Sequence, residues 1–323
     1  MQLAIFFLGA VIIILTFWDF FHTTLSGKGF WVISGTVNGW LSNLILSYPS
    51  KFGFKYSGVA HILLSVGLWL VMLLSGVFMI FASGEDMVVT SGSREPATLV
   101  ERFYFTCYII STLGIGDLEP GNEFSKVLTG IFSFKGFILL TIAMTYLLSV
   151  ISAVLQKKQL ALYISSMGQN IEDLYLFCRS ENSYATLRLY FPELQKLILQ
   201  NASSYGYFPI VHYFLSWNRK TSVEVQLASL YEVLIVLREM VKGKRTETLQ
   251  IDSLLSALDF YLMMGIQEKE KYESEQQELA SLREFWAKKG LPYHKSNTMD
   301  LAMTASLKSA GWKWKEVYSM ESN

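Results

Sequence analysis

The chain has 323 residues, of which 51% are hydrophobic, and it carries 27 basic and 27 acidic residues. This balance excludes the strongly basic surface of a nucleic-acid-binding protein, so no nucleic-acid partner is expected. Up to Leu155 the chain holds only 15 of its 54 charged residues, and the other 39 follow. The sequence therefore predicts a membrane-embedded first half joined to a water-facing second half.

Three apolar stretches in the first half are long enough to cross a bilayer, which takes about 20 residues. They lie at residues 1–22, 57–83 and 125–156. The first stretch lacks the basic leading region and small-residue cleavage site of a signal peptide, so it predicts a retained helix with its N-terminus outside. Residues 35–47 are apolar but too short to span, which predicts an interfacial helix within a cytosolic or interfacial segment, 23–55.

The charges of the connecting segments predict the orientation. Basic residues dominate segment 23–55, and Lys157 and Lys158 follow the third stretch, whereas residues 84–124 carry seven acidic and two basic residues. The positive-inside rule therefore places segment 23–55 and everything after residue 156 in the cytosol. The two cysteines lie far apart and form no disulfide framework, which fits a prokaryotic plasma (inner) membrane.

Between the second and third stretches, residues 111–117 read STLGIGD. The preceding residues, 98–111, are compatible with a helix that is too short to cross the membrane. Non-helical backbone at membrane depth must be shielded by protein or must line a wet path. The sequence therefore predicts a pore domain at 56–156, in which a pore helix at 98–111 enters the membrane and residues 112–117 return to the outside.

The residue types of this loop suit the binding of a dehydrated cation, which needs oxygen atoms in place of its water shell. Gly114 and Gly116 allow backbone conformations that turn successive carbonyl groups toward one axis. The Thr112 hydroxyl adds a further oxygen at the inner end. Leu113 and Ile115 are expected to point away from the axis and hold the segment in place.

The sequence TLGIGD, flanked by an outer helix, a pore helix and an inner helix, resembles the selectivity filter of potassium channels. The resemblance covers about residues 58–155. It implies an all-α membrane protein with a tetrameric, potassium-channel-like pore, permeant potassium ions and no cofactor. The α-helical cytosolic domain is predicted separately, from the helical periodicity of residues 157–323. One pore loop per chain implies a homotetramer within the lipid bilayer. The implied ion-binding residues are Thr112, Leu113, Gly114, Ile115 and Gly116. The implied supports of the filter are Ser111, Asp117, Tyr104 and Phe105.

Two residues depart from the family pattern. Ile115 stands where the commonest members have tyrosine, and isoleucine cannot donate a hydroxyl hydrogen bond to the pore helix. Lys135 places a charge inside the predicted inner helix, where it either faces the cavity or pairs elsewhere in the helix bundle. Because of these departures, a nonselective monovalent cation channel with the same scaffold remains an alternative.

The inner helix contains a glycine where many family members have a hinge, although a glycine there also permits close helix packing. By the family's spacing, four further residues form a stripe that faces the pore. The residues expected to line the pore or its gate are Gly136, Leu140, Met144, Leu148 and Ser152.

Residues 157–323 show helical periodicity, and no G-x-G-x-x-G fingerprint, metal cluster or catalytic cluster is readable. We therefore expect no enzyme activity. A helical cytosolic regulatory domain that responds to an unidentified cytosolic ligand or partner is expected instead. A membrane-anchored sensor or scaffold with a vestigial pore remains a further alternative.

Overall fold

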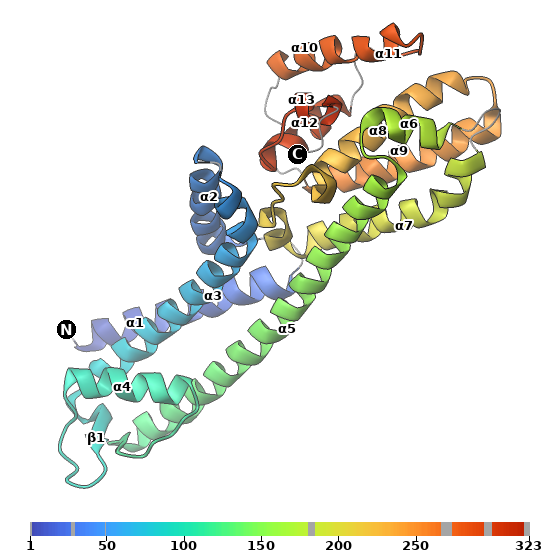
Figure 1. Cartoon of the computed structure of the whole chain (residues 1–323). Helices are drawn as coiled ribbons and strands as arrows, with labels where there is room; N and C mark the ends of the chain where they lie inside the picture. Colours follow the sequence, from blue (N-terminus) through green and yellow to red (C-terminus); the bar gives the residue numbers. More distant parts are fainter. Residues whose placement is uncertain are drawn as a thin grey trace. The chain divides into compact units, whose positions relative to one another are not determined.

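The computed structural model describes residues 2–26, 30–48, 50–179, 185–265, 273–293 and 299–319. The chain folds into two compact units. The membrane unit comprises Met1–Trp40 and His61–Ser149, and the C-terminal unit comprises Leu41–Ala60 and Val150–Asn323. Three helices are long and apolar enough to span a bilayer, and the protein is an all-α membrane protein (Figure 1).

The elements of the first half follow the predicted order, and a small sheet lies in the segment between the second and third apolar helices. They are α1 (Gln2–Leu25), α2 (Val32–Ser47), α3 (Lys51–Ala82), β1 (Val88–Thr90), α4 (Leu99–Ile110), β2 (Leu118–Pro120) and α5 (Glu123–Met167). The strands β1 and β2 pair antiparallel, with Val89 opposite Glu119. Both α2 and α3 begin before the predicted residues, and α5 continues to Met167 instead of ending at residue 156.

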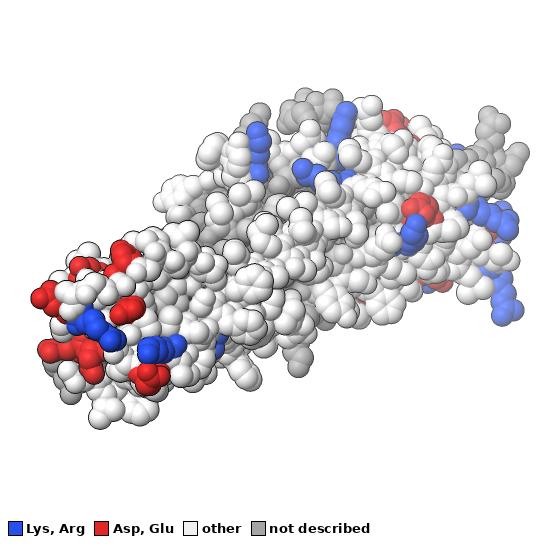
Figure 2. All heavy atoms as spheres, turned by 90° about the horizontal axis from the view of Figure 1, so that it is seen from below, with Lys and Arg blue, Asp and Glu red and all other residues white. Residues whose placement is uncertain are grey.

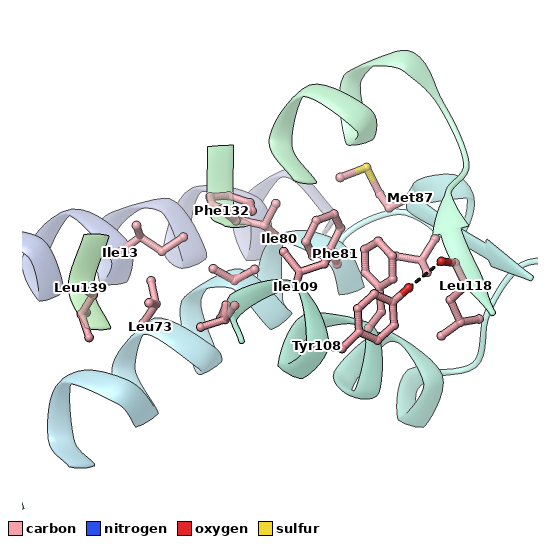
Figure 3. Close-up of a cluster of buried hydrophobic side chains, with 14 of the residues drawn as sticks. Ile13, Leu73, Ile80, Phe81, Met87, Tyr108, Ile109, Leu118, Phe132 and Leu139 are labelled. Carbon is pink, nitrogen blue, oxygen red and sulfur yellow. Dashed lines mark hydrogen bonds between the residues drawn. The ribbon is translucent and has the colours of Figure 1, made fainter. Parts of the chain in front are cut away.

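The apolar helices α1 and α3 approach each other closely at a pair of glycines. A Cβ atom on Gly9 would lie 2.6 Å from the carbonyl oxygen of Gly76, and one on Gly76 would lie 2.9 Å from that of Gly9. Small residues allow such backbone contact between membrane helices. Next to this crossing, side chains of α1, α3, α4 and α5 form a single buried core, which includes Ile13, Phe81 and Phe132 (Figure 3).

A buried carboxylate joins the first three helices. The Trp69 Nε1 atom of α3 donates to Asp19 of α1 at 2.7 Å, and the backbone N–H of Ser34 in α2 donates to the same carboxylate at 3.2 Å. Asn38 of α2 donates to Ser65 of α3 at 2.8 Å. A carboxylate among apolar helices is costly unless it is hydrogen-bonded. The network therefore holds α2 at a fixed register against α1 and α3.

Acidic side chains gather at one end of the membrane unit. On the face shown in Figure 2 they lie around α4 and β1, and the adjoining surface over the apolar helices is mostly uncharged. This distribution matches an acidic connecting segment beside membrane-spanning helices.

The C-terminal unit contains a bundle of helices around α8. In the described part of the chain it holds α6 (Ile171–Cys178), α7 (Ala185–Tyr207), α8 (Val223–Met240), α9 (Arg245–Gly265), α10 (Glu273–Leu282), α11 (Glu284–Lys288), α12 (Asp300–Ser309) and α13 (Trp314–Tyr318). Every residue of α8 from Val223 to Leu237 is buried. A helix buried on all its faces forms the core of its domain.

An ionised cluster fixes the C-terminal segments to α8. The buried Arg283 guanidinium contacts Glu232 of α8 and Asp300 of α12, each at 2.7 Å. The Tyr231 hydroxyl also donates to Asp300, at 2.8 Å. Removing one partner from such a buried cluster leaves an uncompensated charge, so the cluster holds α8, α12 and the start of α11 in one arrangement.

The division into units differs from the predicted boundary at residue 156. Residues 41–60, which include the start of α3, pack with the C-terminal unit. The reason is aromatic packing. The Phe54 ring lies edge-on to Trp217 with ring centroids 5.3 Å apart, and Gly58 leaves room for the ring of Phe214.

Gly136 of α5 is buried against the end of α4. A Cβ atom at this position would lie 2.3 Å from the carbonyl oxygen of Ile110, and α5 continues through Gly136 without a break. This geometry favours the packing role over the hinge role that the sequence left open. At Gly130 in the same helix, an added Cβ atom would meet nothing within 4 Å.

We predict that Gly136→Ala destabilises the protein because its methyl group overlaps the Ile110 backbone, which costs about 1–3 kcal/mol. Gly130→Ala serves as the matched control, because alanine stabilises an open helix position by about 0.5–1 kcal/mol relative to glycine. Thermal unfolding in detergent measures both. Equal unfolding temperatures for the two variants would contradict the packing role.

Candidate functional site

Helix α4 is anchored firmly at its start. Thr98 and Glu101 form a reciprocal capping box, in which the Glu101 carboxylate accepts from the Thr98 N–H at 2.7 Å. The buried Arg102 guanidinium donates to the carbonyl oxygens of Gly84 at 2.8 Å and Glu85 at 3.0 Å. These bonds tie the start of α4 to the chain that follows α3. The position of the next segment, residues 111–117, therefore depends on a rigid helix.

The backbone dihedral φ alternates in sign along residues 112–116. Thr112 has φ 58°, Gly114 has φ 58° and Gly116 has φ 87°, whereas the intervening Leu113 and Ile115 are not in the positive-φ region. A chain in which right-handed and left-handed residues alternate can turn successive N–H groups to one side and its carbonyl groups to the other. A row of carbonyl oxygens is the arrangement that replaces the water shell of a cation.

Thr112 is unusual because non-glycine residues rarely adopt positive φ. Its backbone N–H donates to Ile109 and that of Leu113 donates to Tyr108, at 3.0 and 2.9 Å. These bonds hold the inner end of the loop directly on the last turn of α4. Strained backbone of this kind persists where the surroundings impose it, and it is frequent at functional sites.

The outer end of the loop is tethered by a residue that the sequence analysis missed. The Tyr108 hydroxyl donates to the carbonyl oxygen of Leu118 at 2.5 Å, and the Tyr108 side chain is buried (Figure 3). The backbone N–H of Ser91 donates to the carbonyl oxygen of Asp117 at 3.0 Å. Ile115 lacks a hydroxyl, and Tyr108 supplies a tether from α4 instead. A tyrosine in the last turn of α4 was the available sequence signal.

The two predicted aromatic supports lie in different places. Tyr104 packs edge-on to Tyr108 with ring centroids 5.4 Å apart, near the Asp117 carboxylate. Phe105 is buried instead in the core, edge-on to Phe81 of α3 with ring centroids 5.1 Å apart. Ser111 caps α4, and its hydroxyl donates to the Tyr108 carbonyl oxygen at 3.2 Å.

The loop and one face of α5 are exposed in the single chain. All residues from 111 to 117 are exposed, including Leu113 at 68% and Ile115 at 51%. The predicted stripe is exposed as well, and its members are Leu140, Met144, Leu148 and Ser152. The loop and the stripe thus present surfaces that the single chain leaves uncovered.

Lys135 contacts α1. Its ammonium group lies 5.4 Å from the ring centroid of Phe17 and 5.9 Å from that of Phe132, at cation–π distance. The side chain is half-buried and helps to line a groove with Trp18 and Phe21 of α1. Aromatic rings, rather than a carboxylate, are therefore its neighbours on this face of α5.

The oxygen atoms of residues 112–116 are all neutral. Among the described residues, no group of three or more His, Cys, Asp or Glu side chains could hold a metal ion. The loop instead offers backbone carbonyl groups and the Thr112 hydroxyl. Neutral oxygens are better suited to a cation that is bound weakly and released. A tightly held divalent ion is usually bound by charged carboxylates.

Within the C-terminal unit, α5 carries a buried ion pair. The Lys157 ammonium lies 2.9 Å from the Glu224 carboxylate, and both side chains are almost fully buried. Burial alone raises the pKa of Glu224, but the charge and hydrogen bond of Lys157 outweigh it, so the pKa is lowered. Lys157 also donates to the carbonyl oxygen of Phe214 at 3.1 Å.

Phe214 also reaches α3. An added Cβ atom on Gly58 would lie 2.3 Å from the Phe214 ring, so the ring rests directly on the α3 backbone. Residues 214–217, here called the linking loop, therefore contact both α5 through Lys157 and α3 through Gly58 and Phe54.

Comparison with known proteins agrees with this geometry. A protein-family model described as "Ion channel" matches residues 67–153, which hold the second half of α3, all of α4, the 111–117 loop and the first part of α5. The chain is 27% identical over 251 residues to the uncharacterized membrane protein YdjJ of Bacillus subtilis (strain 168), covering 76% of this chain and 73% of YdjJ. No solved structure matches the chain. The family match supports an ion-channel pore segment in this membrane protein.

Proposed function

We propose that the protein is a potassium-selective channel, in which four copies of the chain surround one passive conduction pathway and the C-terminal unit controls its gate. The observation that carries this proposal is the alternating backbone of residues 112–116. A backbone that alternates in this way can turn its carbonyl groups to one side, where they would replace the water around a potassium ion.

The homotetramer follows from the single loop in each chain. One row of carbonyl oxygens covers only one side of a cation, and a closed filter needs four such rows around an axis. Cyclic symmetry supplies them from identical chains. The exposed loop and the exposed stripe of α5 are the surfaces that such an axis would cover.

Selectivity depends on how firmly the loop is held. Tyr108 braces its outer end through the bond to Leu118 and α4 braces its inner end, which favours a potassium-selective filter. Ile115 contributes no hydroxyl, and this favours the second candidate, a nonselective monovalent cation channel on the same scaffold. A sensor or scaffold with a vestigial pore is the third candidate, but it gives no reason for the alternating backbone.

We propose that contacts of the linking loop within the C-terminal unit control the gate. The linking loop bears on α5 at Lys157 and on α3 at Gly58, and these two helices flank the pore loop in the sequence. A rearrangement of this unit would therefore act on both helices. The basic segments that flank the spanning helices favour a cytosolic C-terminal unit. We propose that the protein lies in the plasma (inner) membrane.

We predict that Tyr108→Phe lowers the potassium-to-sodium permeability ratio of the reconstituted channel. The variant keeps the ring and loses only the hydrogen bond to Leu118, which is worth about 0.5–1.5 kcal/mol. Tyr56→Phe is the matched control, because it removes the hydroxyl of a partly exposed tyrosine in α3. Unchanged selectivity in Tyr108→Phe would show that the tether does not support the filter.

Loss of the buried ion pair should affect gating and leave selectivity intact. Lys157→Met leaves Glu224 buried without its partner, which costs about 3–5 kcal/mol. We expect a lower unfolding temperature and a changed open probability, with partial recovery of stability in the Lys157→Met, Glu224→Gln double variant. Single-channel recording and thermal unfolding measure these effects. An unchanged open probability in Lys157→Met would remove this ion pair from the gating mechanism.

A further inference from the structure

A pocket of about 270 Å³ lies among α10, α12 and α13 of the C-terminal unit. Three lysines, Lys308, Lys313 and Lys315, line it, and Glu278 contributes one opposing carboxylate. All three lysines are exposed at the rim. Lys313 and Lys315 form no ion pair with any described residue, in contrast to Lys242 and Lys244 elsewhere in this unit. The pocket therefore carries an excess of positive charge.

One wall of the pocket is aromatic. Trp312 is half-buried and lies along it, and its Nε1 atom donates to the carbonyl oxygen of Ser216 at 3.2 Å. The Thr304 hydroxyl, which also lines the pocket, accepts from Trp314 at 2.9 Å. A hollow that combines ammonium groups with a flat indole face offers both an anion site and a surface for a non-polar group.

We propose that this pocket binds an organic phosphate, with its anion on the lysine ammonium groups and its organic part against Trp312. Lysine is a common ligand of phosphate because its ammonium is a compact charge with three donors. The pocket volume suits a small ligand, such as a mononucleotide or the headgroup of an anionic phospholipid. Both sources present the same phosphate ester.

The occupied pocket would act on the linking loop. Trp312 is bonded to Ser216 of that loop, and Trp217 of the loop packs on Phe54 at the start of α3. The adjacent Gly311 also approaches Phe54, since an added Cβ atom there would lie 2.6 Å from its ring. Ligand binding is thereby connected to the contacts assigned to gating. This regulatory part rests on the proposed channel function, whereas binding itself does not.

Isothermal titration calorimetry of the full chain in detergent tests binding without any need for conduction. The probes are AMP, dihexanoyl phosphatidic acid and inorganic phosphate. We expect Lys313→Gln, Lys315→Gln to weaken binding of the organic phosphates about tenfold or more, through the loss of two charge-assisted contacts. Lys242→Gln, Lys244→Gln removes the same charge at the same spacing outside the pocket and should change binding less than about twofold.

The titrations distinguish a soluble nucleotide from a lipid headgroup as the source of the phosphate. Tighter binding of AMP identifies a soluble nucleotide as the ligand type, and tighter binding of phosphatidic acid identifies a lipid headgroup. Binding of neither, equal losses in both double variants, or inorganic phosphate binding as tightly as AMP and phosphatidic acid would overturn the proposal.

Trp312→Phe tests the connection to the gate. This variant keeps an aromatic wall but loses the bond to Ser216, so it should retain binding and lose the ligand-dependent change in open probability. A ligand response equal to that of the wild type would overturn the connection. If the wild-type protein carries no current, the calorimetric result still decides whether the pocket binds an organic phosphate.

Discussion

The site depends on the firm attachment of residues 111–117 to α4. Carbonyl groups coordinate a cation only when the backbone holds them in place. In an unrestrained backbone the carbonyl groups would turn toward water or other hydrogen-bond donors. Arg102 fixes the start of α4, the bonds of Thr112 and Leu113 fix the inner end of the loop, and Tyr108 fixes its outer end. The close contact of Gly136 with Ile110 adds α5 to the same support.

The second constraint lies where the chain leaves the membrane unit. The ion pair of Lys157 and Glu224 is buried, and its formation requires α5 to continue as a helix into the C-terminal unit. The linking loop joins this pair to the start of α3, so one short segment contacts both helices. A ligand in the lysine-lined pocket would act through the linking loop. Trp312 donates a hydrogen bond to Ser216 of that loop, and Gly311 approaches Phe54, on which the loop packs.

Much of the membrane unit could be predicted from the sequence because apolar length and loop charge report on spanning helices directly. The conformation of the two loop glycines could also be predicted, because positive φ favours glycine. Gly114 and Gly116 both have positive φ. Positive φ at Thr112 was not predictable, because it depends on the bonds from the end of α4. The tether at Tyr108, the position of Phe105 and the aromatic neighbours of Lys135 were also hidden, since each depends on how helices pack. The same holds for the buried Asp19 network and for the assignment of residues 41–60 to the C-terminal unit.

The central claim is that the backbone of residues 112–116 selects potassium. The most direct measurement is the reversal potential of the wild-type protein in a planar bilayer, with potassium on one side and sodium on the other. We expect a reversal close to the potassium equilibrium potential, despite isoleucine at position 115. A clear current that reverses near zero would contradict it and would identify a nonselective cation channel on the same scaffold.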